Sequence, residues 1–209
     1  YVMHRASQVI AAGANFSLLG FNETALKSKK PVVSVCAVRT GAGKSQTTRR
    51  VCRKLLDAGR KVVAIRHPMP YGDLVKQRVQ RYATIEDLDR YECTIEEREE
   101  YEPHLEAGNV VWAGVDYAEI TARAAAEADL IVWDGGNNDF PFLRPDLLAV
   151  VADALRPDDT TGYHPGESVL RMADVVVVNK VDSARADDVR RVEEIARREN
   201  PRAAVVRAA

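Results

Sequence analysis

Residues 32–45 read Val32-Val33-Ser34-Val35-Cys36-Ala37-Val38-Arg39-Thr40-Gly41-Ala42-Gly43-Lys44-Ser45. The first half is apolar or small, as in a buried strand, and the second half is a glycine-rich turn that leads into a helical pattern. This position between strand and helix is the context that a P-loop requires, because glycines let backbone N–H groups converge on phosphate oxygens. The helix N-terminus that follows also favours an anion. The stretch therefore predicts a phosphate-binding loop.

The predicted loop assigns roles to its residues. Lys44 would reach the β- and γ-phosphates of a nucleoside triphosphate as a catalytic residue, and the Ser45 hydroxyl would ligate Mg²⁺. Val38 departs from the strict pattern, which has a glycine five residues before Gly43. The alternative is a glycine-rich turn with an incidental lysine, and the two motifs that follow in order argue against it. The expected nucleotide contacts are Thr40, Gly41, Ala42, Gly43, Lys44, Ser45 and Gln46.

A second motif is the apolar run Leu130–Trp133, which ends in Asp134 and two glycines. An aspartate at the carboxyl end of a buried strand can hold Mg²⁺ directly or through water, and Asp134 is thus a candidate metal ligand and catalytic residue. Alone, an Asp-Gly turn would be the preferred interpretation. The next residues, Asn137, Asn138 and Asp139, would either order the attacking group or only form a turn, and Asp139 is a further candidate catalytic residue.

A third motif, Asn179-Lys180-Val181-Asp182, follows the apolar run Val175–Val178. An aspartate in this place can accept both N–H groups on one edge of guanine, which adenine cannot match. Asn179 would contact another base edge, and the stem of Lys180 would lie across the ring. The alternative is a strand end with solvated charges.

The 209 residues have a net charge of −1, with 46% hydrophobic and 29% charged residues. This balance provides no field suited to nucleic acid. Three cysteines that are far apart indicate neither a disulfide framework nor a zinc site. No run approaches the ~20 apolar residues of a membrane span, and no signal peptide is recognisable. We therefore expect a cytoplasmic protein that binds neither nucleic acid nor a membrane.

Short β-branched runs alternate with helical stretches along residues 31–209. This alternation predicts an α/β fold in which helices cover both faces of a mostly parallel sheet. Expected helices include 44–58, 95–107 (opened by a capping box at Thr94), 117–128 (capped by Asp116) and 187–199. The polar stretch Glu23–Pro31 predicts a boundary, which makes residues 1–30 the end of a preceding domain plus a linker and 31–209 a P-loop NTPase domain that is truncated at its C-terminus.

The P-loop together with Asn179-Lys180-Val181-Asp182 resembles the branch of P-loop proteins that contains MinD-like, signal-recognition-particle-type and biotin-synthesis enzymes. Many members place a lysine where this chain has Arg39 and use it across a dimer interface. The resemblance implies that Arg39 stabilises the transferred phosphate, in its own site or in that of a partner in a homodimer. An arginine bound to a local carboxylate is the equal alternative.

Four longer blocks resemble the cyclic 2,3-diphosphoglycerate synthetase family: residues 37–41, 66–74, 91–103 and 133–141. In that family an amino-terminal domain precedes the P-loop domain. The resemblance implies ATP-driven closure of an intramolecular phosphoanhydride between the two phosphates of 2,3-diphosphoglycerate, with Mg²⁺ and with ADP and phosphate as products. Such a substrate needs a cationic pocket. The candidate substrate-binding residues are Arg66, His67, Lys76, Arg78 and Arg81, although the last three equally suit a solvated basic helix face.

The sequence is therefore compatible with two functions. The first is a ligase that spends ATP or GTP on a small anionic metabolite, and the second is a regulatory or chaperone-like GTPase acting on a protein partner. Asp182 favours guanine, whereas the resemblance implies ATP. The cationic cluster between Arg66 and Arg81 favours the enzyme. The acidic segment Glu96–Glu102 is interpreted as a charged helix face, and no role is assigned to His164.

Overall fold

A computed structural model describes residues 2–67, 69, 72–136 and 139–209. Its centre is an eight-stranded sheet with the order β3-β4-β2-β5-β1-β6-β7-β8. All neighbouring strands are parallel except β3 and β4, which are antiparallel. The strands are β1 (Val32–Ala37), β2 (Val62–Ile65), β3 (Gln80–Tyr82), β4 (Val110–Ala113), β5 (Leu130–Trp133), β6 (Leu147–Asp153), β7 (Val175–Asn179) and β8 (Ala204–Arg207).

The central strand β1 lies between β5 and β6, with Val33 opposite Val132 on one side and Leu147 on the other. The chain passes from β1 to strands on one side of it and later to strands on the other side. Open α/β sheets bind ligands at such a point, beyond the carboxyl ends of their strands. The strand is almost continuously apolar because both of its faces are covered. The sequence 32–45 thus places the glycine-rich loop at the middle of the ligand-binding edge.

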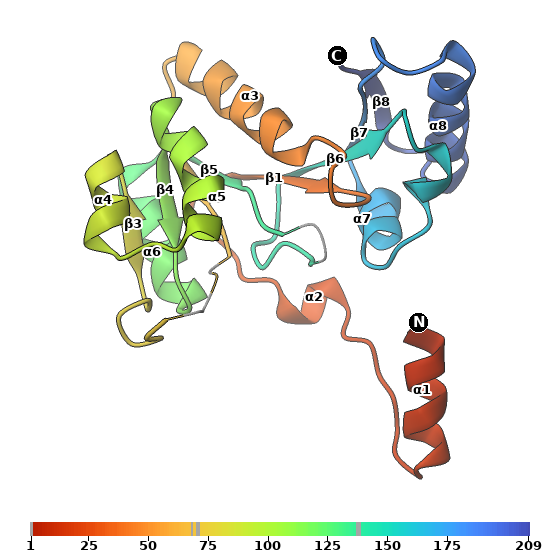
Figure 1. Cartoon of the computed structure of the whole chain (residues 1–209), viewed down its shortest axis with the longest axis horizontal. Helices are drawn as coiled ribbons and strands as arrows, with labels where there is room; N and C mark the ends of the chain where they lie inside the picture. Colours follow the sequence, from red (N-terminus) through yellow and green to blue (C-terminus); the bar gives the residue numbers. More distant parts are fainter. Residues whose placement is uncertain (1, 68, 70–71, 137–138) are drawn as a thin grey trace.

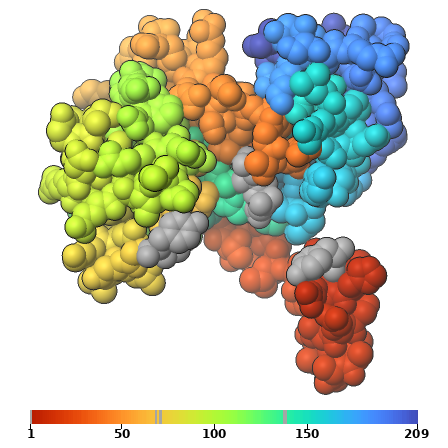
Figure 2. All heavy atoms as spheres, viewed as in Figure 1, coloured from red at the N-terminus to blue at the C-terminus, as the bar shows by residue number. Residues whose placement is uncertain are grey.

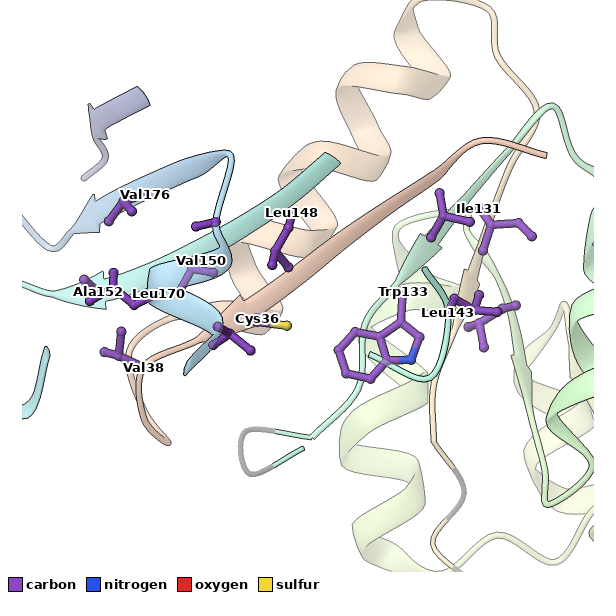
Figure 3. Close-up of a cluster of buried hydrophobic side chains, with 14 of the residues drawn as sticks. Cys36, Val38, Ile131, Trp133, Leu143, Leu148, Val150, Ala152, Leu170 and Val176 are labelled. Carbon is purple, nitrogen blue, oxygen red and sulfur yellow. The ribbon is translucent and has the colours of Figure 1, made fainter. Parts of the chain in front are cut away.

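Helices cover both faces of the sheet (Figure 1). Cys52 of α3 packs with Val35 and Val132 on one face, and Tyr101 of α5 extends that layer over β4. The opposite face carries α6, α7 and α8, whose apolar side chains belong to one hydrophobic cluster with Trp133 and Val150. Figure 3 shows part of this cluster, including Leu170 of α7. The helices are α1 (Val2–Ala11), α2 (Phe21–Thr24), α3 (Lys44–Asp57), α4 (Ile85–Arg90), α5 (Ile95–Glu106), α6 (Tyr117–Glu127), α7 (Gly166–Met172) and α8 (Ala186–Glu199), and Pro157–Thr160 form a 3₁₀ turn.

The expected fold class is confirmed, with small shifts at the element ends. Thr94 and Glu97 form the predicted capping box, and Asp116 caps α6. The sequence did not predict the strand β3, the short helices α2, α4 and α7 or the 3₁₀ turn. Each has only three to seven residues, too few for a hydrophobic period to be recognised. The basic helix face considered for residues 76–81 is wrong, because Gln80–Tyr82 form the edge strand β3.

Residues 2–24 form α1, an irregular connection and α2. In Figures 1 and 2 α1 projects from the body of the molecule. Its side chains are mostly exposed, including the apolar Met3 and Ile10. The connection to the domain is made at Leu26, which exchanges backbone hydrogen bonds with Phe142 and Arg144. The proposed division at residue 30 stays a prediction.

Candidate functional site

The glycine-rich loop adopts the conformation that its sequence demands. Gly41 and Gly43 have φ angles of 83° and 104°, a region that side chains other than glycine rarely enter. A Cβ on Gly43 would lie 2.0 Å from Asn179 Nδ2. Val38, at the position of the missing glycine, has a buried side chain within the hydrophobic core beside α7. The valine therefore leaves the loop open, because its side chain belongs to the core.

The third motif lies directly against this loop. Asn179 Nδ2 donates to the Ala42 carbonyl at 2.9 Å. Lys180 Nζ donates to the Gly41 carbonyl at 2.7 Å and forms an ion pair of the same length with Asp153. Two predicted nucleotide contacts, Asn179 and Lys180, are thus brought to the P-loop, where they also fix its backbone. Asp182 is exposed in the following turn.

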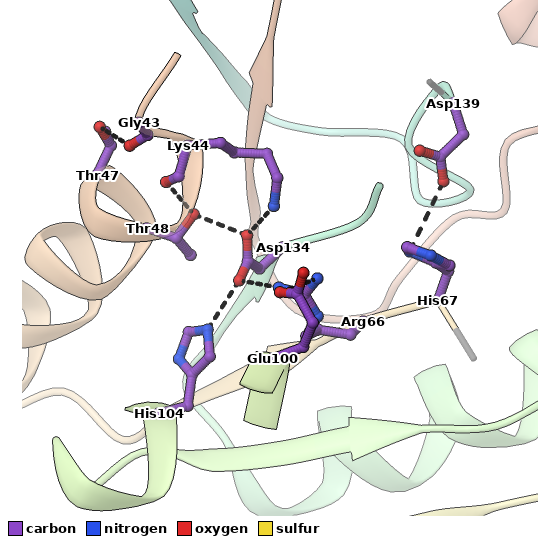
Figure 4. Close-up of polar contacts among 10 residues, drawn as sticks. All are labelled: Gly43, Lys44, Thr47, Thr48, Arg66, His67, Glu100, His104, Asp134 and Asp139. Atoms are coloured by element: carbon purple, nitrogen blue, oxygen red, sulfur yellow. Dashed lines mark hydrogen bonds and ion pairs between the residues drawn. The ribbon is translucent and has the colours of Figure 1, made fainter. Parts of the chain in front are cut away.

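Asp134 is the centre of a buried polar cluster that joins four elements (Figure 4). Its Oδ1 accepts from Lys44 Nζ at 2.5 Å and from Thr48 Oγ1 at 2.9 Å. Its Oδ2 contacts Arg66 Nη1 at 2.6 Å and His104 Nε2 at 2.8 Å. We call these five residues the Asp134 cluster. It ties the start of α3 to the ends of β2 and β5 and to α5.

The charges in the Asp134 cluster compensate one another. Burial alone would raise the pKa of Asp134, but Arg66, Lys44 and the hydrogen bond from His104 hold it well below its ordinary value. Asp134 is therefore a carboxylate at neutral pH. Because a carboxylate only accepts, His104 donates from Nε2, and its Nδ1 lies 3.4 Å from Asn109 Nδ2, a suitable donor.

Of the two expected magnesium ligands, Ser45 is available, whereas the oxygens of Asp134 already accept from protein donors. The half-buried Ser45 at the start of α3 is suitably placed to bind a cation together with phosphate oxygens. A carboxylate offers about four lone-pair positions, and four donors already occupy those of Asp134. The described residues also contain no group of three acidic, histidine or cysteine side chains arranged for a metal. In this arrangement the oxygens of Asp134 accept from protein donors. A contact of Asp134 with Mg²⁺, directly or through water, stays a prediction.

Arg66 and His67 follow β2, and Asp139 follows the neighbouring strand β5. Arg66 is buried and pairs with Glu100 Oε2 at 2.6 Å as well as with Asp134. His67 Nδ1 faces Asp139 Oδ2 at 3.9 Å. These three predicted site residues are brought together beside Lys44. Asn137 and Asn138 lie outside the described residues.

The rest of the predicted cationic pocket lies elsewhere. Arg81 is on the edge strand β3, where it pairs with Glu127 at 3.0 Å. Arg78 precedes that strand and pairs with Asp116 and Glu119. Four strand spacings separate β3 from β1, or about 19 Å at ~4.8 Å each. Lys76 is exposed in the preceding turn. The structure does not bring these three cations to the P-loop in one pocket.

Arg39 contacts a local carboxylate. Its guanidinium pairs with Asp159 in the 3₁₀ turn, its Nε donates to the Thr40 carbonyl at 2.9 Å, and it lies 6.0 Å from the ring centre of Tyr163. This is the alternative that the sequence left open. A contact across a dimer stays a prediction.

Sequence reasoning missed several members of the site. Thr48 follows Lys44 by one helical turn, and this spacing could have placed it against Asp134. Glu100 belongs to the segment interpreted as a solvated face, and it reaches the buried Arg66 instead. His104 and Asp153 carried no local signal, because their contacts depend on residues 30 and 27 positions away.

A family model described as "CobW/HypB/UreG, nucleotide-binding domain" matches residues 120–207. This region holds β5, the Asp134 position and the Asn179 motif. A protein of Thermococcus kodakarensis, named "Arginine synthetase ArcE", is 62% identical over all 209 residues. The chain spans 47% of the length of that relative, so about half of the relative has no counterpart here.

Solved structures share the architecture. LpxK from Aquifex aeolicus, crystallised with ATP, is similar at a TM-score of 0.57 and 18% identity, covering 78% of this chain and 53% of that one. The hydrogenase maturation factor HypB of Archaeoglobus fulgidus covers 86% of this chain and 80% of its own at 16% identity, with a TM-score of 0.47. The sheet order, the P-loop and the LpxK likeness establish the P-loop NTPase fold. Within the described ranges no helix is long and apolar enough to cross a bilayer.

Proposed function

We propose that this chain carries the nucleotide site of a cytoplasmic, ATP-dependent synthetase that phosphorylates an oxygen of a small metabolite. The observation that supports this most is the Asp134 cluster, in which the P-loop lysine is held at 2.5 Å from a fully buried carboxylate. Ion pairs of this kind, buried at the carboxyl edge of a sheet, are a mark of functional sites.

The chain's own residues suggest how phosphoryl transfer would proceed. The loop backbone between Gly41 and Ser45 would bind the phosphates. Lys44 Nζ would exchange its hydrogen bond to Asp134 for one to a γ-phosphate oxygen. Arg66 and His104 would keep the remaining carboxylate in place. Magnesium, when bound at Ser45, would neutralise charge on the β- and γ-phosphates. The γ-phosphoryl group would then pass in line to a substrate oxygen beside Arg66.

Arginine is the first product to test, because the relative that is 62% identical is named an arginine synthetase. Arginine carries nitrogen where the ureido group of citrulline carries oxygen. Phosphorylation of that oxygen would turn it into a phosphate leaving group, which an amine displaces. A nearly neutral substrate also suits the site, since Arg66 is paired with Glu100 and Asp134. Arg78 and Arg81 pair with carboxylates away from the P-loop.

Cyclic 2,3-diphosphoglycerate is the second product to test, on the family resemblance of the four sequence blocks. A substrate with two phosphate groups requires several free cations close together. Lys76 of the predicted pocket lies in an exposed turn and His67 faces Asp139. Because the side chains of Arg66, Arg78 and Arg81 are paired with carboxylates, we favour free arginine as the product over the cyclic diphosphate.

A GTPase that regulates a protein partner is the alternative function. It is favoured by one observation: Asn179 and Lys180 lie against the P-loop, with Asp182 exposed beside them. In this function the small metabolite would have no effect on nucleotide turnover.

A product assay on the full-length protein separates these functions. The protein is incubated with Mg²⁺ and either ATP or GTP, together with citrulline and ammonium or with 2,3-diphosphoglycerate, and products are identified by mass spectrometry. A synthetase forms one nucleoside diphosphate per product and none in a Lys44→Met variant. Hydrolysis at the same rate without any metabolite would contradict the synthetase and leave the GTPase.

A further inference from the structure

Three buried polar atoms beside the Asp134 cluster have no hydrogen-bond partner among the described residues. They are Arg66 Nε, His67 Nδ1 and Asp139 Oδ1. Buried polar groups in folded proteins are almost always paired, so unpaired ones call for a ligand or a catalytic role. The contacts that Arg66 makes with Asp134 and Glu100 use its Nη atoms and leave Nε unpaired.

His67 and Asp139 are held close by the sheet and by one glycine. Their strands, β2 and β5, are parallel neighbours with Ile65 opposite Trp133, so both residues emerge at the same edge. A Cβ on Gly136 would lie 2.6 Å from Asp139 Oδ1 and 3.0 Å from His67 Cε1. A side chain at Gly136 would therefore force Asp139 or His67 to shift. Figure 4 shows the imidazole and the carboxylate facing each other across from His104.

The charges around His67 favour its neutral form. Burial lowers its pKa most, and Arg66 and Lys44 lower it further, whereas Asp139 and Glu100 raise it. Burial likewise raises the pKa of Asp139. His67 is therefore an uncharged imidazole at neutral pH, with one nitrogen free to accept a proton. A carboxylate at Asp139 would stabilise the imidazolium that results.

We propose that His67 and Asp139 form the proton-accepting pair of the synthetase, with His67 as the general base and Asp139 as its orienting partner. This inference rests on the proposed function. Asp139 accepts from His67 Nδ1–H, so that His67 Nε2 faces the reaction. The two atoms lie 3.9 Å apart, and catalytic hydrogen bonds often tighten only when the substrate is bound.

Phosphoryl transfer precedes formation of the C–N bond. The γ-phosphoryl group leaves the β-phosphate and bonds to the substrate oxygen. The lone pair of an amine then attacks the carbon that bears this oxygen, and a C–N bond forms. One N–H proton passes to His67 Nε2, the C–O bond breaks, and inorganic phosphate departs with the electron pair. Ring closure by a phosphate oxygen releases no proton, so the pair is needed for C–N bond formation only.

The kinetic test uses the full-length protein with ammonium and with hydroxylamine as nucleophiles. His67→Gln should lower the rate with ammonium by about 10²- to 10⁴-fold, the usual contribution of a general base. The loss should be smaller with hydroxylamine, whose adduct releases its proton more readily. In this variant the increase of the rate with pH on the acid side of the pH–rate profile should disappear. In Asp139→Asn that rise should move to lower pH, because a negative charge that supports the imidazolium is gone.

His4→Gln, which changes an exposed histidine on α1, is the matched control and should keep the wild-type profile. Equal losses with the two nucleophiles, or an unchanged acid limb in His67→Gln, would overturn the proposal. If His67 and Asp139 were only structural, their variants would lower all rates without shifting the acid side of the pH–rate profile.

A second test does not depend on turnover. NMR titration of ¹⁵N-labelled histidines should show His67 titrating below the ordinary value of about 6.5, and lower still in Asp139→Asn. An unchanged His67 pKa in that variant would refute the coupling. If the wild-type protein forms no product, the proposed function fails, and the titration still decides whether the pair exists.

Discussion

Replacing Asp134 by asparagine removes the negative charge that pairs with Lys44. Both side chains are almost fully buried, at 0% and 4% exposure. Breaking a buried ion pair at one partner costs about 3–5 kcal/mol, because the other charge stays buried without compensation. Arg66 keeps Glu100 as a partner, so the loss should lie near the lower end, about 3 kcal/mol. For a chain of this size that lowers the melting temperature by about 6–12 °C.

The pH dependence of this effect has a definite sign. The pKa of Asp134 is depressed in the folded protein, so its contribution to stability is present above the unfolded pKa of about 3.9. It is lost as the pH falls through the folded pKa. The stability difference between wild type and Asp134→Asn should therefore stay constant between about pH 5 and 8 and shrink below about pH 4.

Urea and thermal unfolding of the nucleotide-free proteins, followed by circular dichroism, measure the effect. Asp159→Asn is the matched control, because its pair with Arg39 has both side chains about one-fifth exposed and should contribute at most about 1 kcal/mol. A loss below about 1 kcal/mol in Asp134→Asn, or a difference that persists unchanged at pH 3, would refute the reasoning about the Asp134 cluster.

Three further predictions concern the loop and the substrate side. Gly43→Ala should weaken nucleotide binding at least tenfold in calorimetry, because its Cβ would lie 2.0 Å from Asn179 Nδ2, whereas Gly41→Ala meets no atom within 4 Å and should lose less; equal losses would contradict the steric argument. Lys180→Met should destabilise the fold by about 1–3 kcal/mol in urea unfolding, since it leaves the buried Asp153 without its cation; an unaltered midpoint would show that Lys180 does not brace the loop. The double variant Arg78→Ala and Arg81→Ala should change KM for the small substrate less than twofold, because both arginines are paired at the sheet edge. A tenfold rise in KM would show that they belong to a substrate-binding cationic pocket.

The sequence allowed much of the fold to be predicted because its signals are local. The runs at Val32, Leu130 and Val175 are continuous and apolar, as buried parallel strands must be, and the glycines at 41 and 43 fix the turn between strand and helix. The strand β3 lacked such a signal. It is short, it contains Arg81, and it is a strand only because β4 offers it a free edge.

The site was predictable to the extent that its residues follow strands. Lys44, Asp134 and Arg66 end up together because the carboxyl ends of parallel strands share one edge of the sheet. His104 reaches the same carboxylate from a helix, and no spacing in the sequence relates the two. Charge alone was misleading for Arg78 and Arg81, since it does not reveal which acids lie next to them in the fold. The sequence does not reveal which charged residues, distant along the chain, form ion pairs in the folded protein.

The transfer of the γ-phosphoryl group to a substrate oxygen is tested most directly by following that oxygen. Citrulline labelled with ¹⁸O in its ureido group is incubated with the full-length protein, ATP, Mg²⁺ and ammonium, and the inorganic phosphate is analysed by ³¹P NMR. The proposed function predicts one ¹⁸O atom in phosphate for each arginine formed, and neither product in Lys44→Met. Unlabelled phosphate, or phosphate released without arginine, would contradict it.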